Sequence, residues 1–127
     1  MREIKFRVWD GKKFLSGRDL DNICLGLDGE VLVLEANELC LAGDEYKVQQ
    51  FTGLKDKNGV EIYEGDILAE QENGFEENII NYYEIVYDNE NATFKARVKN
   101  GYSYNFTHYN QHENTVIGNV FENPELI

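Results

Sequence analysis

Positively charged side chains are scarce in this 127-residue chain and absent from its middle. There are 12 Lys and Arg against 24 Asp and Glu, and the formal net charge is −12. Residues 58–94 hold ten carboxylates and not one Lys or Arg. Because non-specific affinity for nucleic acid rests mostly on Lys and Arg, this composition argues against nucleic acid as a partner. The acidic region is either a solvated surface, a docking site for a basic protein partner, or a charge mimic of nucleic acid.

Long hydrophobic runs are also missing. No apolar run reaches 18 residues, so no transmembrane helix and no membrane association are expected. The first five residues, Met-Arg-Glu-Ile-Lys, are not followed by the apolar stretch of a signal peptide. We therefore expect a protein of the cytoplasm.

Metal-binding and redox motifs are lacking. The two cysteines, Cys24 and Cys40, form no CxxC pair, and we expect them to be reduced and buried as small apolar residues. A disulfide or metal role is the alternative. His108 and His112 have the four-residue spacing of helical metal ligands, but no third ligand is evident. The sequence predicts no metal and no other cofactor.

No catalytic constellation is evident either. Glu64 and Asp66 are near enough in sequence to act as paired carboxylates, but an Asp that caps a turn beside an exposed Glu is the commoner arrangement. Ser16 and Ser103 lack the context of an activated nucleophile. We therefore do not expect an enzyme.

One proline and 11 glycines suit turns between short strands. Ile4, Phe6 and Val8 alternate with cations, and Asp10-Gly11 then predicts a hairpin turn. A second hairpin is expected around Asp28-Gly29, whereas residues 16–22 are predicted to be a loop. Residues 35–41 are compatible with a strand or with a short helical turn that ends at Gly43.

The segment from Gln50 to Leu68 carries the strongest turn signals. Asn58-Gly59 predicts a two-residue hairpin turn in which both residues take positive φ. Gly65 permits a sharp bend whose backbone N–H groups Asp66 can cap. The expected core consists of Phe51, Ile62, Ile67, Val116 and Val120.

The remaining chain also predicts strands. Residues 79–87 and 92–98 have strand character, residues 102–106 follow the turn at Asn100-Gly101, and residues 70–78 are expected to be a loop. In the last strand, 116–121, Gly118 is predicted to permit a bulge or a close backbone approach. Short strands at this spacing are typical of an all-β barrel or sandwich.

Two features point to partners. Lys95, Arg97 and Lys99 alternate along one predicted strand face, and with Tyr102 and Tyr104 across a hairpin they would form a small nucleic-acid patch. A solvated strand face is the plainer interpretation. Sixteen aromatic residues, several alternating on short strands, suggest apolar surface left exposed in a monomer and hence a homo-oligomer.

Three blocks of the sequence resemble the YopX family of phage and prophage proteins. They are Arg2–Asp10, Gln50–Leu68 and Val116–Leu126, in the family's order and from end to end of the chain. The resemblance implies a phage-type protein with a small SH3-like barrel in its C-terminal half, no enzyme activity and no known ligand. The residues expected to shape its structural motifs are Gly53, Asn58, Gly59, Gly65, Asp66, Gly118 and Asn119.

Together these observations predict a mainly β protein with a β-rich N-terminal segment, residues 1–49, and a C-terminal SH3-like β-barrel, residues 50–127. The predicted function is that of a non-enzymatic accessory or protein-interaction module. The alternative is a nucleic-acid-associated module that uses the strand face of Lys95, Arg97 and Lys99.

Overall fold

The protein is described by a computed structural model that covers residues 3–73, 78–99, 101–106 and 113–127. It divides into two compact units, which we describe separately. The N-terminal unit is Lys5–Gln50, and the C-terminal unit comprises Met1–Ile4 and Phe51–Ile127. Strand β5 (Lys47–Lys55) contributes residues to both.

The N-terminal unit contains two small antiparallel arrangements. In one, β1 (Phe6–Trp9) pairs with the first residues of β5. The predicted turn forms one residue later than expected, with Gly11 and Lys12 between Asp10 and Lys13, because Asp10 N–H donates to Lys13 O at 3.0 Å. Asp10 Oδ1 accepts the N–H groups of Lys12 and Lys13, each at 2.8 Å. The returning strand is reduced to one bridge between Trp9 and Phe14. Buried Trp9 meets the Phe14 ring edge-on, with 5.0 Å between centroids.

The other arrangement is a three-stranded sheet of β2 (Ile23–Leu25), β3 (Val31–Glu35) and β4 (Glu38–Leu41). The predicted hairpin around Asp28-Gly29 is confirmed. The helical alternative for residues 35–41 is wrong. Ala36 and Asn37 both take positive φ, 49° and 65°, and this two-residue turn matches the twist of the strands it joins. The predicted loop at 16–22 contains the 3-10 helix η1 (Gly17–Asn22).

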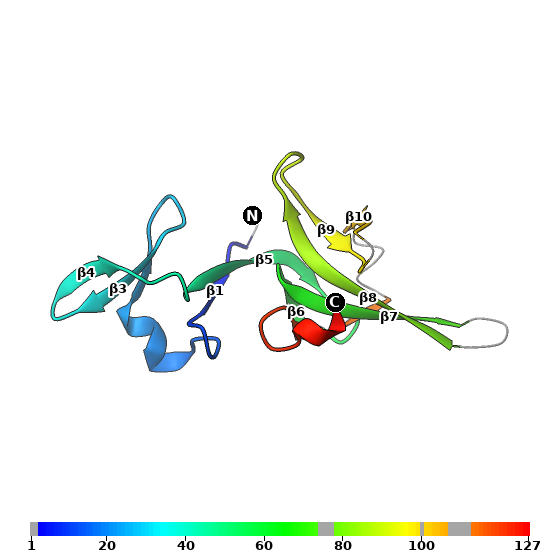
Figure 1. Cartoon of the computed structure of the whole chain (residues 1–127), viewed down its shortest axis with the longest axis horizontal. Helices are drawn as coiled ribbons and strands as arrows, with labels where there is room; N and C mark the ends of the chain where they lie inside the picture. The colour runs from blue at the N-terminus through cyan, green and yellow to red at the C-terminus, as the bar shows by residue number, and fades with distance from the viewer. Residues whose placement is uncertain (1–2, 74–77, 100, 107–112) are drawn as a thin grey trace. The chain divides into compact units, whose positions relative to one another are not determined.

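The C-terminal unit is built on a five-stranded antiparallel sheet in the order β10-β9-β8-β7-β11. Its strands are β7 (Asp66–Asn73), β8 (Asn78–Asp88), β9 (Thr93–Arg97), β10 (Ser103–Asn105) and β11 (Asn114–Asn119). Strand β6 (Glu61–Tyr63) pairs with the end of β5, and η2 (Pro124–Leu126) closes the chain. Figure 1 shows β7 and β8 as a long pair of neighbouring strands.

Two sequence predictions need correction here. Among the described residues β10 and β11 lie at opposite edges of the five-stranded sheet, so the sheets are not closed into a barrel and the SH3-like barrel is not confirmed. Turn dipeptides predict where hairpins form, but they do not predict whether the edge strands of a sheet pair to close a barrel. The loop predicted at 70–78 is also wrong in part, because β7 continues to Asn73 and β8 begins at Asn78. Backbone pairing there overrides an acidic composition that suggested a loop.

The core of the C-terminal unit lies on one face of this sheet. Ile62, Leu68, Ile85 and Ala96 form a buried cluster, and Val116 packs against it half-buried. The predicted core residues Phe51 and Ile67 are also buried, whereas Val120 is only half-buried. Alternation along β9 places Phe94 and Ala96 toward the core, as the sequence pattern predicts.

Candidate functional site

The turn at Asn58-Gly59 is organised by Asp56, a residue that the sequence reading did not single out. Only Gly59 of the predicted pair is left-handed, with φ 83°, so the two-residue turn is wrong. Instead Asp56 N–H donates to Val60 O at 2.8 Å and Gly59 N–H donates to Asp56 O at 3.0 Å. These bonds close a three-residue loop, Lys57 to Gly59, with glycine at its left-handed position.

The carboxylate of Asp56 binds three backbone N–H groups. Its Oδ1 accepts from Asn58 at 2.8 Å and from Val60 at 2.9 Å. Its Oδ2 accepts from Val116 on β11, at 2.9 Å and 60 residues away in the sequence. Asp56 is buried, so this side chain ties the hairpin loop to the last strand. The third bond explains why a local sequence pattern could not identify Asp56.

The bend predicted at Gly65-Asp66 forms. Gly65 takes φ 82°, and Asp66 Oδ2 accepts the Tyr63 N–H at 2.8 Å. Asp66 is almost fully buried, while Glu64 is half-buried. A carboxylate that caps a turn suits a structural role better than acid–base chemistry, which needs a group free to exchange protons.

The other motif residues shape strands. Gly53, with φ 88°, lies where the pairing of β5 with β6 shifts register. Gly118 lies at a bulge in the pairing of β11 with β7, and a Cβ there would come within 2.7 Å of Asn123 Cγ. The bulge predicted near Gly118 is therefore confirmed, whereas the group that approaches Gly118 closely is the Asn123 side chain and not another backbone segment. Asn119 Oδ1 accepts the N–H groups of Phe121 and Glu122, each at 3.0 Å, and so holds the turn after the strand.

The cysteines do not behave as predicted. Cys24 and Cys40 are free, but both are exposed rather than buried. No residue of their small sheet is buried, which the apolar pattern alone could not reveal. His108 and His112 lie outside the described residues. Within the described ranges, no three His, Cys, Asp or Glu side chains gather closely enough to hold a metal ion.

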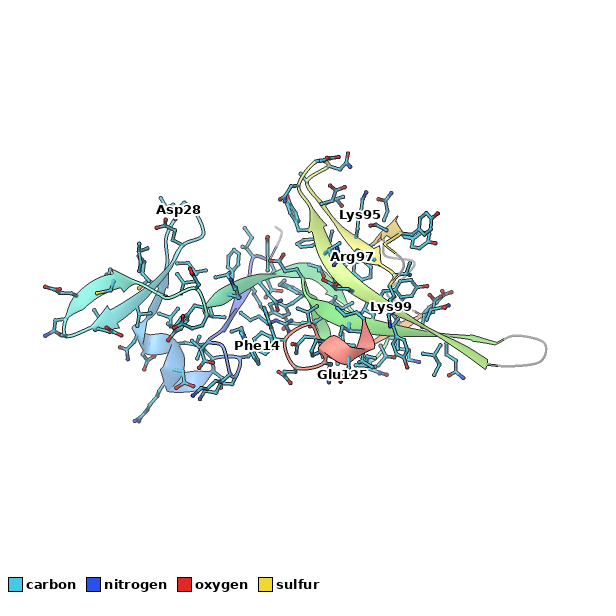
Figure 2. The ribbon with its side chains drawn as sticks, viewed as in Figure 1. Phe14, Asp28, Lys95, Arg97, Lys99 and Glu125 are labelled. Carbon is cyan, nitrogen blue, oxygen red and sulfur yellow. The ribbon has the colours of Figure 1, made fainter. Side chains whose placement is uncertain are left out.

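The proposed nucleic-acid patch is divided between two faces of the sheet. Lys95, Arg97 and Lys99 follow one another along β9 and beyond it (Figure 2). In the pairing of β10 with β9, Tyr104 lies opposite Ala96 and therefore on the core side of the sheet. Successive residues of a strand point to opposite faces, so Lys95 and Arg97 point away from Tyr104. The hypothesis that bases stack on Tyr104 while phosphates bind these cations is therefore wrong.

Two of these cations are also neutralised locally. Lys95 Nζ lies 2.9 Å from Asp88 Oδ2, and Arg97 Nη2 lies 2.8 Å from Glu84 Oε1. Among the described carboxylates between 58 and 94, Asp88 and Glu84 are thus used in these ion pairs and Asp66 is used in its turn. Lys99 is exposed and lines a hollow of about 450 Å³ together with Arg97 and Glu84.

A larger hollow, about 740 Å³, opens on the core face of the five-stranded sheet. Aromatic, amide and carboxylate side chains line it, among them Tyr83, Tyr104, Phe106, Asn81, Asn114 and Glu70. These groups can pack against the ring of a bound ligand and exchange hydrogen bonds with the ligand's polar atoms. They provide neither a nucleophile beside a base nor a cation to stabilise developing negative charge.

A third surface lies on the small sheet of the N-terminal unit. Direct pairing joins Cys24 to Leu32, Leu32 to Leu41 and Leu34 to Leu39. Residues paired in this way share one face, so the five side chains form a single apolar surface, which we name the leucine face. Leu34, Leu39 and Leu41 are 39%, 57% and 68% exposed. No residue of β2, β3 or β4 is buried.

No helix in the described segments has the length and apolar character needed to cross a bilayer.

Comparison with known proteins identifies relatives of the whole chain. The family model described as YopX protein matches residues 5–127. The crystal structure of protein EF1440 from Enterococcus faecalis is similar, with a TM-score of 0.66, 29% identity and 99% of each chain covered. The crystal structure of protein yopX from Bacillus subtilis has the same fold, with a TM-score of 0.58, 20% identity, and 99% of this chain and 96% of that chain covered. No functionally curated protein shows significant similarity to the chain. Because the family model spans nearly all of the sequence, the chain belongs to the YopX family.

Proposed function

We propose that this YopX-family chain is a non-enzymatic accessory protein that acts by binding a basic protein partner in the bacterial cytoplasm. The observation that carries the proposal is the coexistence of exposed apolar side chains with a strongly acidic composition. Fifteen large hydrophobic residues are exposed among those described, and the net charge is −12. Apolar surface of this kind marks interaction sites, and carboxylates around it select partners of opposite charge.

A phage or prophage origin is part of the same proposal. It is supported by the resemblance of the three sequence blocks to phage and prophage proteins. If it is right, the transcript rises when a resident prophage is induced with mitomycin C. A transcript that stays constant through induction would remove this part of the proposal and leave the binding function untouched.

The test of the binding function is a pulldown from host lysate with the purified chain as bait. We expect one or more basic proteins to be retained at low salt, with or without nuclease, and to be released as salt is raised, since exposed charges are screened within about 8 Å at physiological ionic strength. Retention abolished by nuclease would instead favour the alternative, a nucleic-acid-associated module. Absence of any retained protein would reject the proposal.

Self-association is a second proposal, because aromatic side chains also remain exposed on the C-terminal unit. Tyr82, Tyr87, Tyr102 and Tyr104 are between 38% and 69% exposed. Tyr is favoured at protein interfaces, where its ring supplies area and its hydroxyl supplies a hydrogen bond. These tyrosines belong to the C-terminal unit, whereas the leucine face belongs to the N-terminal unit. Self-association and binding of a basic partner can therefore be tested independently.

A further inference from the structure

We propose that the leucine face is the docking site for the basic partner, and that its occupant is an amphipathic segment with apolar residues flanked by lysine or arginine. This inference rests on the proposed binding function and assigns it to a place in the fold. The leucine face consists of Cys24, Leu32, Leu34, Leu39 and Leu41.

The apolar part of the argument is the exposure of a continuous surface. Three of its four leucines are more than one-third exposed, and the fourth, Leu32, is half-buried. Because the leucines lie directly across from one another on two adjacent strands, they form one patch rather than scattered contacts. A soluble chain seldom leaves such a patch uncovered unless it binds something there.

The charge of the surrounding segment decides what binds. Residues 19–46 contain the whole three-stranded sheet and have eight carboxylates but no Lys or Arg. Those carboxylates are Asp19, Asp21, Asp28, Glu30, Glu35, Glu38, Asp44 and Glu45. Asp28 lies on the loop between β2 and β3 (Figure 2). Glu35 and Glu38 form the pair next to Leu34 and Leu39 and therefore point to the opposite face. Glu30 and Asp44 line a hollow with Leu41, so a partner that covers the leucines meets these two carboxylates, and cations at its rim are favoured.

The same charges argue against a second copy of the chain on this face. A two-fold contact places identical surfaces together, and each acidic rim would then meet another acidic rim. Anionic lipid and nucleic acid are disfavoured for the same reason as a second copy.

A hollow at the other end of β3 and β4 fits the side chain of such a partner. It measures about 380 Å³, and Leu41, Tyr46, Glu30 and Asp44 are among its lining residues, together with Lys47. A lysine or arginine could lay its aliphatic stem along Leu41 and Tyr46 and direct its charge toward the two carboxylates. Lys47 offsets one of these two negative charges. The hollow therefore favours a cation at one end of the bound segment.

The experiment measures binding of a fluorescent peptide by anisotropy. The peptide is an 18-residue helix former with leucine on one face and lysine on the other, and a second peptide has glutamate in place of lysine. We expect the lysine peptide to bind and the glutamate peptide not to bind. Leu39→Ser with Leu41→Ser, and separately Glu30→Lys with Asp44→Lys, should each weaken binding by about tenfold or more.

Matched controls make the same chemical changes in the C-terminal unit. Ile80→Ser removes an aliphatic side chain that is 53% exposed, and Glu122→Lys with Glu125→Lys reverses two exposed carboxylates. Neither control should weaken binding by more than about twofold, since neither touches the leucine face. Equal loss in the controls would show only general charge attraction and would overturn the inference. If the serine variant fails to fold by circular dichroism, the charge-reversal pair still decides the question.

Two further outcomes would overturn the assignment while leaving other conclusions intact. If the wild-type chain forms a dimer that Leu39→Ser with Leu41→Ser dissociates in light scattering, the occupant is a second copy. If the pulldown retains a basic protein equally with wild type and the serine variant, the binding function stands but this site is wrong. Failure of wild type to retain any protein would instead reject the proposed function itself.

Discussion

At the scale of single residues, Asp56 joins two parts of the C-terminal unit that are distant in sequence. Its carboxylate satisfies three backbone N–H groups, two in its own loop and one on β11. Replacing it with alanine leaves buried donors without an acceptor, at about 1–3 kcal/mol each. We expect Asp56→Ala to lower the free energy of unfolding by about 3 kcal/mol, measured by urea denaturation.

The control for this prediction is Asp28→Ala. Asp28 accepts a single backbone N–H, from Glu30 at 3.1 Å, in an exposed loop. Its loss should cost less than about 1 kcal/mol because water replaces the acceptor. Similar losses for Asp28→Ala and Asp56→Ala would show that the long-range bond to Val116 contributes nothing.

Asp88 offers a residue-scale prediction about pH. The Asn91 amide, which donates to Asp88 Oδ2 at 2.8 Å, holds the pKa of this carboxyl well below its ordinary value of 3.8, and the nearby Lys95 ammonium lowers it further. Because the folded pKa is depressed, the stabilisation is present above the unfolded pKa and is lost as pH falls from there toward the folded pKa. An NMR titration should find the Asp88 midpoint below 3.8.

Substitutions separate the two causes of this shift. Asn91→Ala and Lys95→Ala should each raise the Asp88 midpoint, since the Asn91 hydrogen bond is the largest single cause and Lys95 acts through both a hydrogen bond and its charge. Lys99→Ala removes a charge from the same strand face and should leave the midpoint unchanged. A midpoint at or above 3.8 in the wild type would contradict the ion pair and the hydrogen bond together.

At the scale of elements, the turn between β3 and β4 uses a poorly suited residue. Ala36 adopts φ 49°, a left-handed conformation that costs an alanine about 1–2 kcal/mol. Asn-Gly is the preferred pair for such a turn. Ala36→Asn with Asn37→Gly should therefore stabilise the N-terminal unit by about 1 kcal/mol, seen as slower hydrogen exchange of β3 amides. Asn37→Ala should have the opposite effect, and slower exchange in that variant would refute this account of the turn.

How much the sequence could predict also differs from element to element. Alternation and Asp-Gly located the hairpins at Asp10-Gly11 and Asp28-Gly29, because these signals act within a few residues. The helix considered for 35–41 failed because Ala36 adopts a conformation that alanine seldom takes. The bond between Asp56 and Val116 depends on which strands become neighbours, and the sheet faces of Tyr104 and Arg97 depend on the register between strands. Composition does not determine either of these. That the sheets do not close into a barrel could not be predicted for the same reason.

At the scale of the whole molecule, exposed aromatic surface and acidic charge make opposite contributions to self-association. Tyrosines left exposed on the C-terminal unit favour contact between copies, while a net charge of −12 opposes it. We expect association that strengthens with salt, because screening weakens the repulsion but not the apolar contact. Light scattering at high concentration and raised salt should give a mass above 14.7 kDa, and Tyr102→Ser with Tyr104→Ser should reduce it. A strict monomer under these conditions would exclude a homo-oligomer.

The charge of the whole molecule also sets its affinity for nucleic acid. Lys95 and Arg97 are paired with Asp88 and Glu84, so they offer less positive charge than their spacing suggests. Tyr104, the expected stacking partner, lies on the other face of the sheet. In a salt series with labelled duplex and single-stranded DNA, we expect dissociation constants above about 10 μM at physiological salt. Sub-micromolar binding that is lost in Lys95→Ala with Arg97→Ala, but kept in Lys12→Ala with Lys13→Ala, would establish the strand face as a nucleic-acid site. That result would favour the alternative function, a nucleic-acid-associated module, over binding of a basic protein partner.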